Sequence, residues 1–353
     1  MKLLYKSLLG IVVIGIIFYF TNMLYARCGW EKDIQKIDGL KMLTDLNDGM
    51  DRDDIFYFAE SSNSTYSEKD TITKSISAMT NDCFPKLKIS SIERGALHAG
   101  VYKKLISNIR KDAKVKTIIV TMNLRSFGSN WINSSAENNC QELQIAYSDY
   151  PPLLKKMMFV FRAYSYKEDW ERTEDYINDI TYTKIKGPLP LPFNTAREWD
   201  NYIANNLFRD SNGIENRPKI ELACHNVKIF GFNIDTLTNP RIKDFDKIVE
   251  LCKKKKIKLF FNLLAENTEY ADSLVGKELL MVMRENKTIL VNYYSRKGVT
   301  VIDNFELVKG IDYIDQSWTT EHYNQAGRLV IARNMAKTLN QEFPEYMYSC
   351  IVP

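Results

Sequence analysis

Three residue types in this sequence could together carry out acyl chemistry: a serine, a histidine and a carboxylate. Ser61 stands where five uncharged residues (55–59, IFYFA) give way to the polar run ESSNS. A serine needs a base in order to attack at neutral pH, and histidine is the usual base. The chain has only three histidines, His98, His225 and His322. We expect His322 to be the base, because it lies in a polar loop that opens the last predicted helix.

The elements that position these residues form an alternating pattern. Strands are predicted at 55–59, 86–92, 115–122, 257–264 and 299–302, and helices at 67–79, 99–109, 240–254, 271–286 and from 321 or 324 to about 340. This alternation predicts an α/β fold, with a parallel sheet and helices on both of its faces. Ligands of such sheets bind beyond the carboxyl ends of the strands, where Ser61 and His322 would meet. His98, after the second strand, could also line that edge.

A region between about 139 and 220 departs from this pattern. It contains Pro151-Pro152, several aromatic residues and the run GPLPLPF at 187–193. Proline cannot continue a helix or a central strand, so the proline-rich run is predicted to be extended or turn-like. We interpret 139–220 as an insertion packed beside the carboxyl edge of the sheet, as a lid or a partner surface.

The amino terminus carries a candidate membrane anchor. Twenty residues without a charge, 7–26, are long enough to cross a bilayer of about 30 Å. Lys2 and Lys6 precede them, so the positive-inside rule places the amino terminus in the cytoplasm and everything after Arg27 outside, in the periplasm or beyond the cell. The alternative is a cleaved signal peptide, but Leu24 is too large for the usual cleavage pattern.

The predicted organisation follows from these boundaries: a cytoplasmic tail (1–6), a transmembrane anchor (7–26), a connector (27–52), a catalytic domain with its insertion (53–345) and a tail (346–353). With 45% hydrophobic residues, the 353-residue chain can bury a sizeable core. A net charge of +4, from 48 Lys plus Arg against 44 Asp plus Glu, is too small to indicate a nucleic-acid partner.

The six cysteines show no CxxC spacing, which leaves a zinc site without support. Export would permit disulfides, but their connectivity cannot be read from the sequence. No metal or organic cofactor is indicated.

The order of the candidate residues resembles that of the SGNH hydrolases, also called the GDSL esterase and acyltransferase superfamily. The segment 59–61, Ala-Glu-Ser, is similar to the family's GDS block. Gly95, after the second strand, resembles its glycine, Asn123, after the third, its asparagine, and His322 the histidine of its DxxH block. The resemblance implies a three-layer, flavodoxin-like fold with a five-stranded parallel sheet.

The resemblance also implies roles for these residues. Ser61 would be the nucleophile and His322 the general base. The backbone N–H of Ser61 or of its neighbour, the N–H of Gly95 and the side-chain amide of Asn123 would hold the oxyanion. Such donors, aimed at the oxygen of a tetrahedral intermediate, are often the largest contribution to acyl transfer.

The acid that should complete the site is missing from its family position, where Thr319 stands. Glu321, adjacent to His322, and Asp315, seven residues before it, are the two candidates for this role. A Ser-His dyad supported by a backbone carbonyl is a further alternative. A degenerate site without catalysis is another.

Together with the anchor, the resemblance favours one functional class. Exported, membrane-anchored members with a large insertion resemble the accessory acyltransferases of cell-envelope modification, such as alginate O-acetylation and teichoic acid D-alanylation. Those proteins work beside a membrane-bound O-acyltransferase. We therefore expect Ser61 to take an acyl group, acetyl in the first instance, and to transfer it to an envelope or exported glycan. The alternatives are a membrane-anchored carbohydrate or lipid esterase and a non-catalytic glycan-binding or scaffold subunit.

Overall fold

The computed structural model describes residues 2–30, 32–33, 41–187, 190–191, 193–316 and 318–344. Within these residues, five strands form one sheet: β1 (Ile55–Ala59), β2 (Ile89–Glu93), β3 (Thr117–Met122), β4 (Lys258–Leu263) and β5 (Thr300–Asp303). The strand order is β2-β1-β3-β4-β5, and every neighbouring pair is parallel. The predicted α/β fold with a five-stranded parallel sheet is confirmed, and each predicted strand overlaps an observed one.

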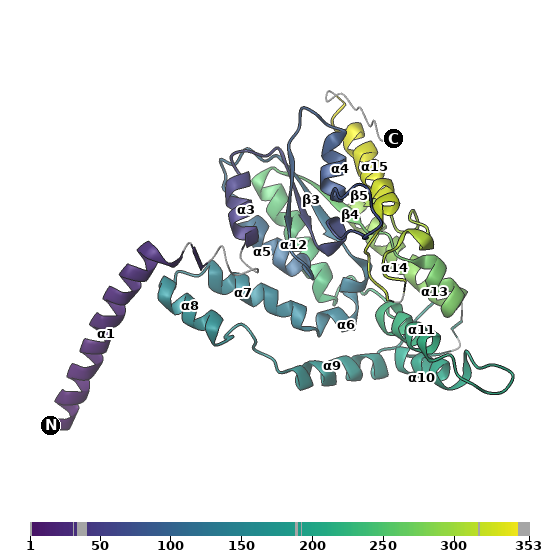
Figure 1. Cartoon of the computed structure of the whole chain (residues 1–353), viewed down its shortest axis with the longest axis horizontal. Helices are drawn as coiled ribbons and strands as arrows, with labels where there is room; N and C mark the ends of the chain where they lie inside the picture. Colours follow the sequence, from purple (N-terminus) through teal and green to yellow (C-terminus); the bar gives the residue numbers. More distant parts are fainter. Residues whose placement is uncertain are drawn as a thin grey trace.

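Helices account for most of the remaining described residues (Figure 1). They are α1 (Lys2–Cys28), α3 (Lys41–Gly49), α4 (Ile76–Asp82), α5 (Ala99–Ser107), α6 (Ser129–Ile132), α7 (Asn138–Ala146), α8 (Pro152–Val160), α9 (Asp169–Tyr182), α10 (Ala196–Asn206), α11 (Arg217–Phe230), α12 (Pro240–Lys255), α13 (Thr268–Leu274), α14 (Lys277–Arg296) and α15 (Gln325–Glu342). Short 3-10 turns are η1 (Ser61–Asn63), η2 (Leu124–Phe127), η3 (Ser135–Glu137) and η4 (Gly310–Asp312).

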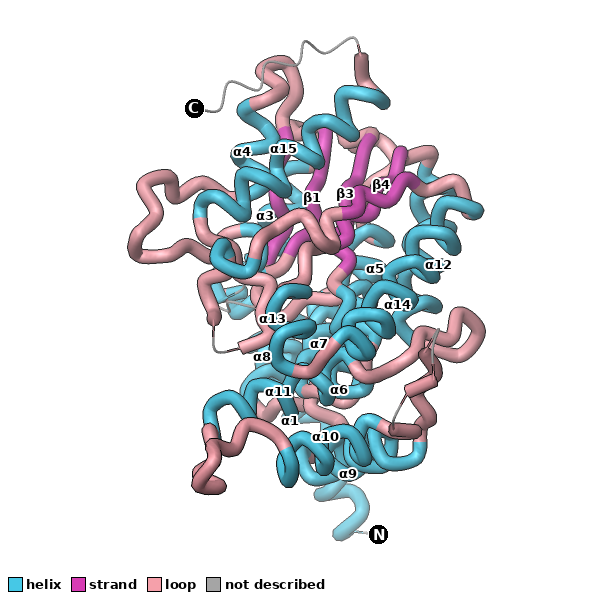
Figure 2. The backbone as a smooth tube through the Cα atoms, turned by 90° about the vertical axis from the view of Figure 1, so that its right-hand side faces the viewer, coloured by secondary structure: helices cyan, strands magenta, loops and turns pink. Residues whose placement is uncertain are grey.

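The sheet is the middle of three layers (Figures 1 and 2). Side chains of β1 alternate between its faces, as the pleat requires. Phe56 and Phe58 point into the core shared with α5, α12 and α14, whereas Ile55 and Tyr57 point into the core shared with α4 and α15. All five residues of β1 are buried, so this strand is fixed from both faces and its carboxyl end is held rigidly.

The strand order also indicates where a ligand would bind. The chain leaves β1 for β2 on one side of it and then returns past β1 to β3 on the other side. In an open parallel sheet this reversal leaves a crevice beyond the carboxyl ends of the two central strands. Ser61 follows β1 and Asn123 follows β3, so both stand at the rim of that crevice.

The predicted helix at 67–79 is wrong in most of its length. The observed helix, α4, begins only at Ile76, with Ser75 as its N-cap. The preceding loop is held by the buried Arg328 of α15, which donates hydrogen bonds to the carbonyls of Thr65 and Ile72 at 2.9 Å. These tertiary bonds satisfy backbone groups that a helix would otherwise pair, and they override a weak apolar period.

The predicted helix at 271–286 is two helices, α13 and α14. Gly276 separates them with a φ of +120°, a conformation that side-chain-bearing residues rarely adopt.

The insertion is largely helical, from α7 to α11. Pro152 is tolerated there because it occupies the first turn of α8, where no intrahelical N–H bond is needed. The proline-rich run 187–193 lies partly outside the described residues.

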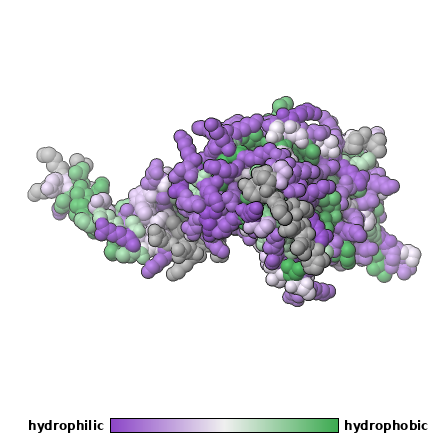
Figure 3. All heavy atoms as spheres, turned by 90° about the horizontal axis from the view of Figure 1, so that it is seen from above, coloured by the Kyte–Doolittle hydropathy of each residue, from purple (hydrophilic) through white to green (hydrophobic). Residues whose placement is uncertain are grey.

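The amino-terminal helix α1 is long and apolar enough to span a membrane. Its candidate span, Tyr5–Cys28, has a mean hydropathy of 2.1, and no part of its most apolar window is buried by the rest of the protein. Figure 3 shows it as an apolar arm that projects from a largely hydrophilic body. The predicted anchor at 7–26 lies within this span.

Candidate active site

Ser61 is the first residue of η1, and only Glu60 separates it from the end of β1. Glu60, the residue before the 3-10 turn, has an extended conformation, and the backbone then turns sharply, with the N–H of Ser64 bonding the carbonyl of Ser61 at 3.2 Å. The hydroxyl of Thr65 donates to the same carbonyl at 2.7 Å. The turn therefore presents the Ser61 side chain at the carboxyl edge of the sheet, as the sequence predicts.

His322 comes from the loop before α15. The N–H of Ile314 bonds its carbonyl at 2.8 Å, and Tyr313 and Tyr323 form an antiparallel bridge beside it. Asn324 caps α15 by accepting from the N–H of Gly327 at 3.0 Å. These contacts close the loop into a hairpin-like turn that holds the imidazole over the end of β1.

The structure places three of the candidate residues within hydrogen-bond distance of one another in sequence, from Ser61 to His322 to Asp315. Ser61 Oγ lies 3.0 Å from His322 Nε2, and His322 Nδ1 lies 2.7 Å from Asp315 Oδ2. The Asp315 carboxylate accepts a hydrogen bond from Nδ1–H of His322, and this tautomer leaves the Nε2 lone pair free to accept the Ser61 hydroxyl proton. The hydroxyl of Thr320 donates to the same carboxylate oxygen. The arrangement has the geometry of a serine nucleophile, a general base and an orienting acid.

Glu321, the other candidate acid, faces the interior instead. Its Oε2 pairs with Arg125 Nη2 at 2.6 Å and accepts from Asn123 Nδ2 at 2.9 Å. Glu321 is buried, whereas Asp315 is about one third exposed. Adjacent residues of an extended chain point to opposite sides, which explains why the neighbour of His322 in sequence is not its partner in space.

The predicted oxyanion donors have different surroundings. Gly95 lines the same pocket as Ser61, and a Cβ placed on its Cα would meet no atom within 4 Å. No described residue accepts a hydrogen bond from the backbone N–H of Ser61 or Gly95. Asn123 differs, because its amide Nδ2 donates both to Glu60 Oε1, at 3.1 Å, and to Glu321 Oε2.

A buried polar network lies directly beneath the serine and the histidine. It comprises Glu60, Asn123, Arg125, Glu266 and Glu321. Burial, together with the nearby Glu321 carboxylate, raises the pKa of Glu60 to about 7. The same two causes raise the pKa of Glu266 well above its ordinary value. The positive charge of Arg125 therefore lies beside the three buried carboxyl groups of Glu60, Glu266 and Glu321. Protonation of some of these groups relieves the excess negative charge.

Sequence reasoning missed Arg125 and Glu266. The available signal was similar to the one that singled out Ser61: each residue lies three positions after the end of a buried strand, Arg125 after β3 and Glu266 after β4. It also missed Thr320, the neighbour of Thr319 at the family's acid position. The Thr319 hydroxyl is buried and has no hydrogen-bond partner among the described residues.

The pocket beside Ser61 is polar and has a volume of about 600 Å³. Its lining includes the hydroxyl-bearing residues Ser61, Ser64, Thr65, Ser75, Ser77, Ser90 and Ser91 and the charged residues Lys41, Asp45, Arg52, Glu60, Glu93 and Arg94. A pocket for a hydrophobic ligand is mostly apolar. This composition suits a hydroxyl-rich or charged molecule better.

Comparison with known proteins adds little to this geometry. No protein-family model matches the chain, and no curated protein matches it. Among solved structures, the crystal structure of a "putative acylhydrolase" from Bacteroides fragilis aligns with 87% of this chain and 98% of its own, at 9% identity and a TM-score of 0.38. A likeness this low carries no argument about function.

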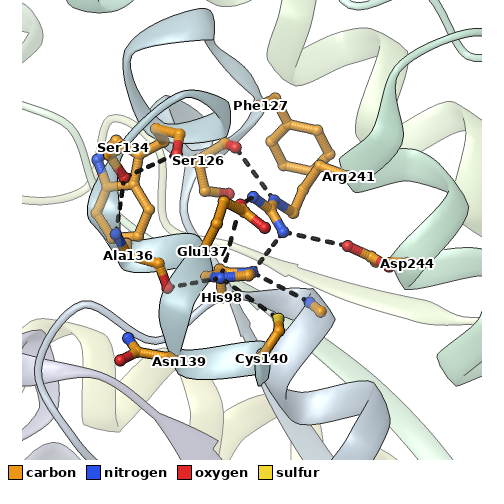
Figure 4. Close-up of polar contacts among 12 residues, drawn as sticks. His98, Ser126, Phe127, Ser134, Ala136, Glu137, Asn139, Cys140, Arg241 and Asp244 are labelled. Atoms are coloured by element: carbon orange, nitrogen blue, oxygen red, sulfur yellow. Dashed lines mark hydrogen bonds and ion pairs between the residues drawn. The ribbon is translucent and has the colours of Figure 1, made fainter. Parts of the chain in front are cut away.

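His98 does not line the pocket that contains Ser61, and its partners are groups that hold the fold together (Figure 4). It caps α5, where its Nδ1 accepts from the N–H of Gly100 at 3.2 Å and from the guanidinium of Arg241. Its Nε2 lies 3.3 Å from the carbonyl of Ala136. Burial and the charge of Arg241 hold its pKa well below the ordinary value, so His98 is neutral, with the proton on Nε2.

This cluster also offers three metal-ligand atoms. His98 Nε2 lies 3.6 Å from Glu137 Oε1 and 3.8 Å from Cys140 Sγ. A metal at Nε2 would need the lone pair that carries the proton in the observed tautomer. The buried Arg241 already pairs with Glu137 and supplies the positive charge there. The hydrogen bonds thus favour an arginine-centred structural cluster over a metal centre.

His225 connects the insertion to the loop of His322. It lies on α11, and its ring stacks on Trp318 with the ring centroids 3.8 Å apart. Burial and the nearby Arg125 lower its pKa to about 4. His225 is therefore neutral near pH 7, and its ring contacts Trp318 in the loop of His322.

Proposed function

We propose that this protein is a serine-dependent acyltransferase, which takes an acyl group, acetyl in the first instance, onto Ser61 and passes it to a hydroxyl of an envelope or exported glycan. The observation that carries the proposal is the continuous hydrogen-bonded line from Ser61 through His322 to Asp315. The sequence resemblance to the SGNH superfamily agrees with it.

In the first step, Ser61 Oγ attacks the acyl carbonyl while its proton moves to His322 Nε2. Asp315 keeps the imidazole oriented and stabilises its positive charge. The tetrahedral oxyanion would be held by the backbone N–H groups of Ser61 and Gly95. The leaving group takes the proton from His322 and departs, which leaves an ester on Ser61.

In the second step, a hydroxyl oxygen of the acceptor attacks that ester. His322 removes the hydroxyl proton and returns it to Ser61 Oγ as the ester bond breaks. Water can attack in the same way, so an esterase would use the same residues. The polar, hydroxyl-lined pocket beside Ser61 supports a sugar acceptor over an apolar one.

Asn123 joins this oxyanion set only if its amide releases one of its two carboxylate partners, Glu60 or Glu321. Protonated Glu60 is the weaker acceptor of the two. We therefore propose the backbone donors as the principal ones and Asn123 as a supplementary donor.

We also propose that the domain after α1 faces the periplasm or the cell exterior. Lys2 and Lys6 precede the apolar span, as in proteins with a cytoplasmic amino terminus. Cys83 is disulfide-bonded, and disulfides are typical of oxidising compartments. In that location a membrane-bound O-acyltransferase could supply the acyl group.

The test is to trap the acyl-enzyme. Purified full-length protein in detergent, incubated with p-nitrophenyl acetate, should gain the mass of one acetyl group, and the gain should disappear in Ser61→Ala and His322→Ala but persist in His98→Ala. If the unmodified protein gains no acetyl group and releases no p-nitrophenol, it is not an acyltransferase or an esterase. Added glycan should speed loss of the adduct and yield acetylated sugar, whereas an esterase would release acetate at the same rate with or without glycan.

A further inference from the structure

Helix α8 in the insertion is apolar without being buried. Seven of its nine residues are apolar, in the sequence PLLKKMMFV, yet none of its side chains is buried. Met157 and Val160 are 43% and 63% exposed, and Phe161, the residue after the helix, is 74% exposed. Soluble domains rarely leave such a contiguous apolar surface facing water.

This helix is attached to the candidate membrane span. The N–H of Leu153, in the first turn of α8, donates to the side-chain oxygen of Asn22 in α1 at 3.0 Å. Lys156 pairs with Asp33, just beyond α1, at 3.1 Å. The ammonium of Lys155 lies 5.6 Å from the ring centroid of Trp30. Three separate contacts thus join α8 to α1 and to the residues just after it.

The position of Asn22 sets the depth of α8 relative to a membrane. Asn22 lies inside the candidate span, Tyr5–Cys28, six residues before its end. At 1.5 Å per residue, this separation is roughly 9 Å along the helix axis. Amphipathic helices that lie in a bilayer surface bury their apolar faces by about 5–10 Å. If α1 spans a bilayer, the first turn of α8 therefore lies at the depth of the outer surface of that bilayer.

Further aromatic side chains continue this surface beyond α8. Tyr166 and Trp170 are 64% and 66% exposed. In Figure 1, α8 and α9 run away from the end of α1 along the side of the molecule from which α1 projects, and in Figure 2 α9 again lies at that end. Tyrosine and tryptophan are enriched where proteins meet lipid headgroups.

We propose that the surface formed by Met157, Val160, Phe161, Tyr166 and Trp170, the α8 surface, lies in the headgroup region of the bilayer that α1 spans. Its apolar side chains contact lipid, so the insertion rests on the membrane and does not close over Ser61 as a lid. A bilayer is the favoured occupant because the contacts between α1 and α8 hold this surface at membrane depth without any partner. The proposal goes beyond acyl transfer and rests on α1 being a membrane anchor.

The test uses photo-crosslinking in the full-length protein reconstituted into phosphatidylcholine and phosphatidylglycerol vesicles. The photoreactive residue p-benzoyl-phenylalanine replaces Phe161 in one variant. It replaces Val12, within the span, in the positive control. It replaces Ile311 in the matched control, which is 78% exposed and shares a groove with Leu329 of α15, on the far side of the domain from α1.

Irradiation should add the mass of one phospholipid at positions 12 and 161 but not at position 311. A lipid adduct at 12 without one at 161 overturns the proposal while leaving the anchor intact. Equal lipid adducts at 161 and 311 overturn it as well, because they indicate unspecific contact. In cell membranes, crosslinking of position 161 to a protein and not to lipid would also overturn the proposal, because the α8 surface would then bind a protein partner. None of these outcomes depends on Ser61 chemistry, which the acyl-enzyme experiment tests separately.

Discussion

His322 Nδ1 lies 2.7 Å from Oδ2 of Asp315, a residue seven positions earlier in the chain, and not from the adjacent Glu321. The loop between them doubles back, with the N–H of Ile314 bonded to the carbonyl of His322. Asp315 thereby faces the imidazole from the solvent side, while Glu321 points inward to Arg125. The two carboxylates nearest His322 in the sequence of this loop thus have different partners.

We predict that Asp315→Asn slows acylation of Ser61 strongly. The amide can donate to Nδ1 and so favour the tautomer with its proton on Nε2, which cannot accept the serine proton. Comparable changes in serine triads reduce turnover on the order of 10⁴-fold. The measurement is the burst of p-nitrophenol from p-nitrophenyl acetate in the full-length protein.

Glu321→Gln is the matched control for that prediction, since it removes a carboxylate beside the same histidine. We expect it to lower the melting temperature, because Arg125 loses its closest anionic partner, and to leave the acylation rate per folded molecule near that of the unmodified protein. A larger loss of acylation in Glu321→Gln than in Asp315→Asn would assign the acid role to Glu321.

We predict a smaller effect for Thr320→Val. The Thr320 hydroxyl donates to the Asp315 oxygen that faces His322, so its loss frees the carboxylate to rotate. Losing one hydrogen bond to a charged group costs about 1.5–3 kcal/mol at most. We expect a decrease in the acylation rate of roughly tenfold, which corresponds to about 1.4 kcal/mol, and a melting temperature that falls by no more than a few degrees. Thr320→Ser should restore the rate, and failure to do so would mean that packing of the methyl group, and not the hydroxyl, matters.

Arg328 is predicted to hold the loop that follows Ser61. Its fully buried guanidinium bonds Asp70 Oδ2 at 2.9 Å and also the carbonyls of Thr65 and Ile72. Removing one partner of a buried ion pair typically costs about 3–5 kcal/mol. Arg328→Met should therefore lower the free energy of unfolding by that order in urea titrations. It should also speed hydrogen exchange in 65–74.

Lys337→Met, on an exposed position of the same helix, controls for the loss of a positive charge from α15. It should change neither quantity. If Arg328→Met left the exchange of 65–74 unchanged, the loop would be held by its other contacts, such as the bonds from the N–H groups of Thr71 and Ile72 to Gln325.

The strands of the sheet could be predicted from the sequence, whereas the loop before α4 could not. β1 and β3 were predictable because each is a short, fully buried apolar run that ends in polar residues. The loop before α4 was not, because Arg328, more than 250 residues later, supplies the bonds that keep it from being helical. Local periodicity cannot report a partner that is distant in the chain.

The same contrast holds for the candidate site. Ser61 and His322 could be selected as candidates because Ser61 closely follows a buried apolar run and because the sequence offers only three histidines. Asp315 and Glu321 could not be separated, since that choice depends on how the loop 312–324 folds back. Glu266 joins the site only through pairing of the parallel strands, which brings the ends of β3 and β4 together.

The buried carboxyl groups predict an unusual dependence of stability on pH. In the folded protein the pKa of Glu60 is about 7, above its ordinary value of 4.5, so between these values the folded state binds more protons than the unfolded state. The stabilisation of the folded state by protonated Glu60 is therefore complete below pH 4.5 and is lost as the pH rises through about 7.

In Glu60→Gln, which keeps an oxygen for Asn123, this loss of stability should be absent. The free energy of unfolding of Glu60→Gln, measured in urea, should thus rise relative to that of the unmodified protein as the pH increases across this range. Glu68→Gln, at an exposed position, controls for the loss of one negative charge. A difference between Glu60→Gln and the unmodified protein that stays constant with pH would mean that Glu60 has the same proton affinity in both states, despite its burial between Asn123 and Glu321.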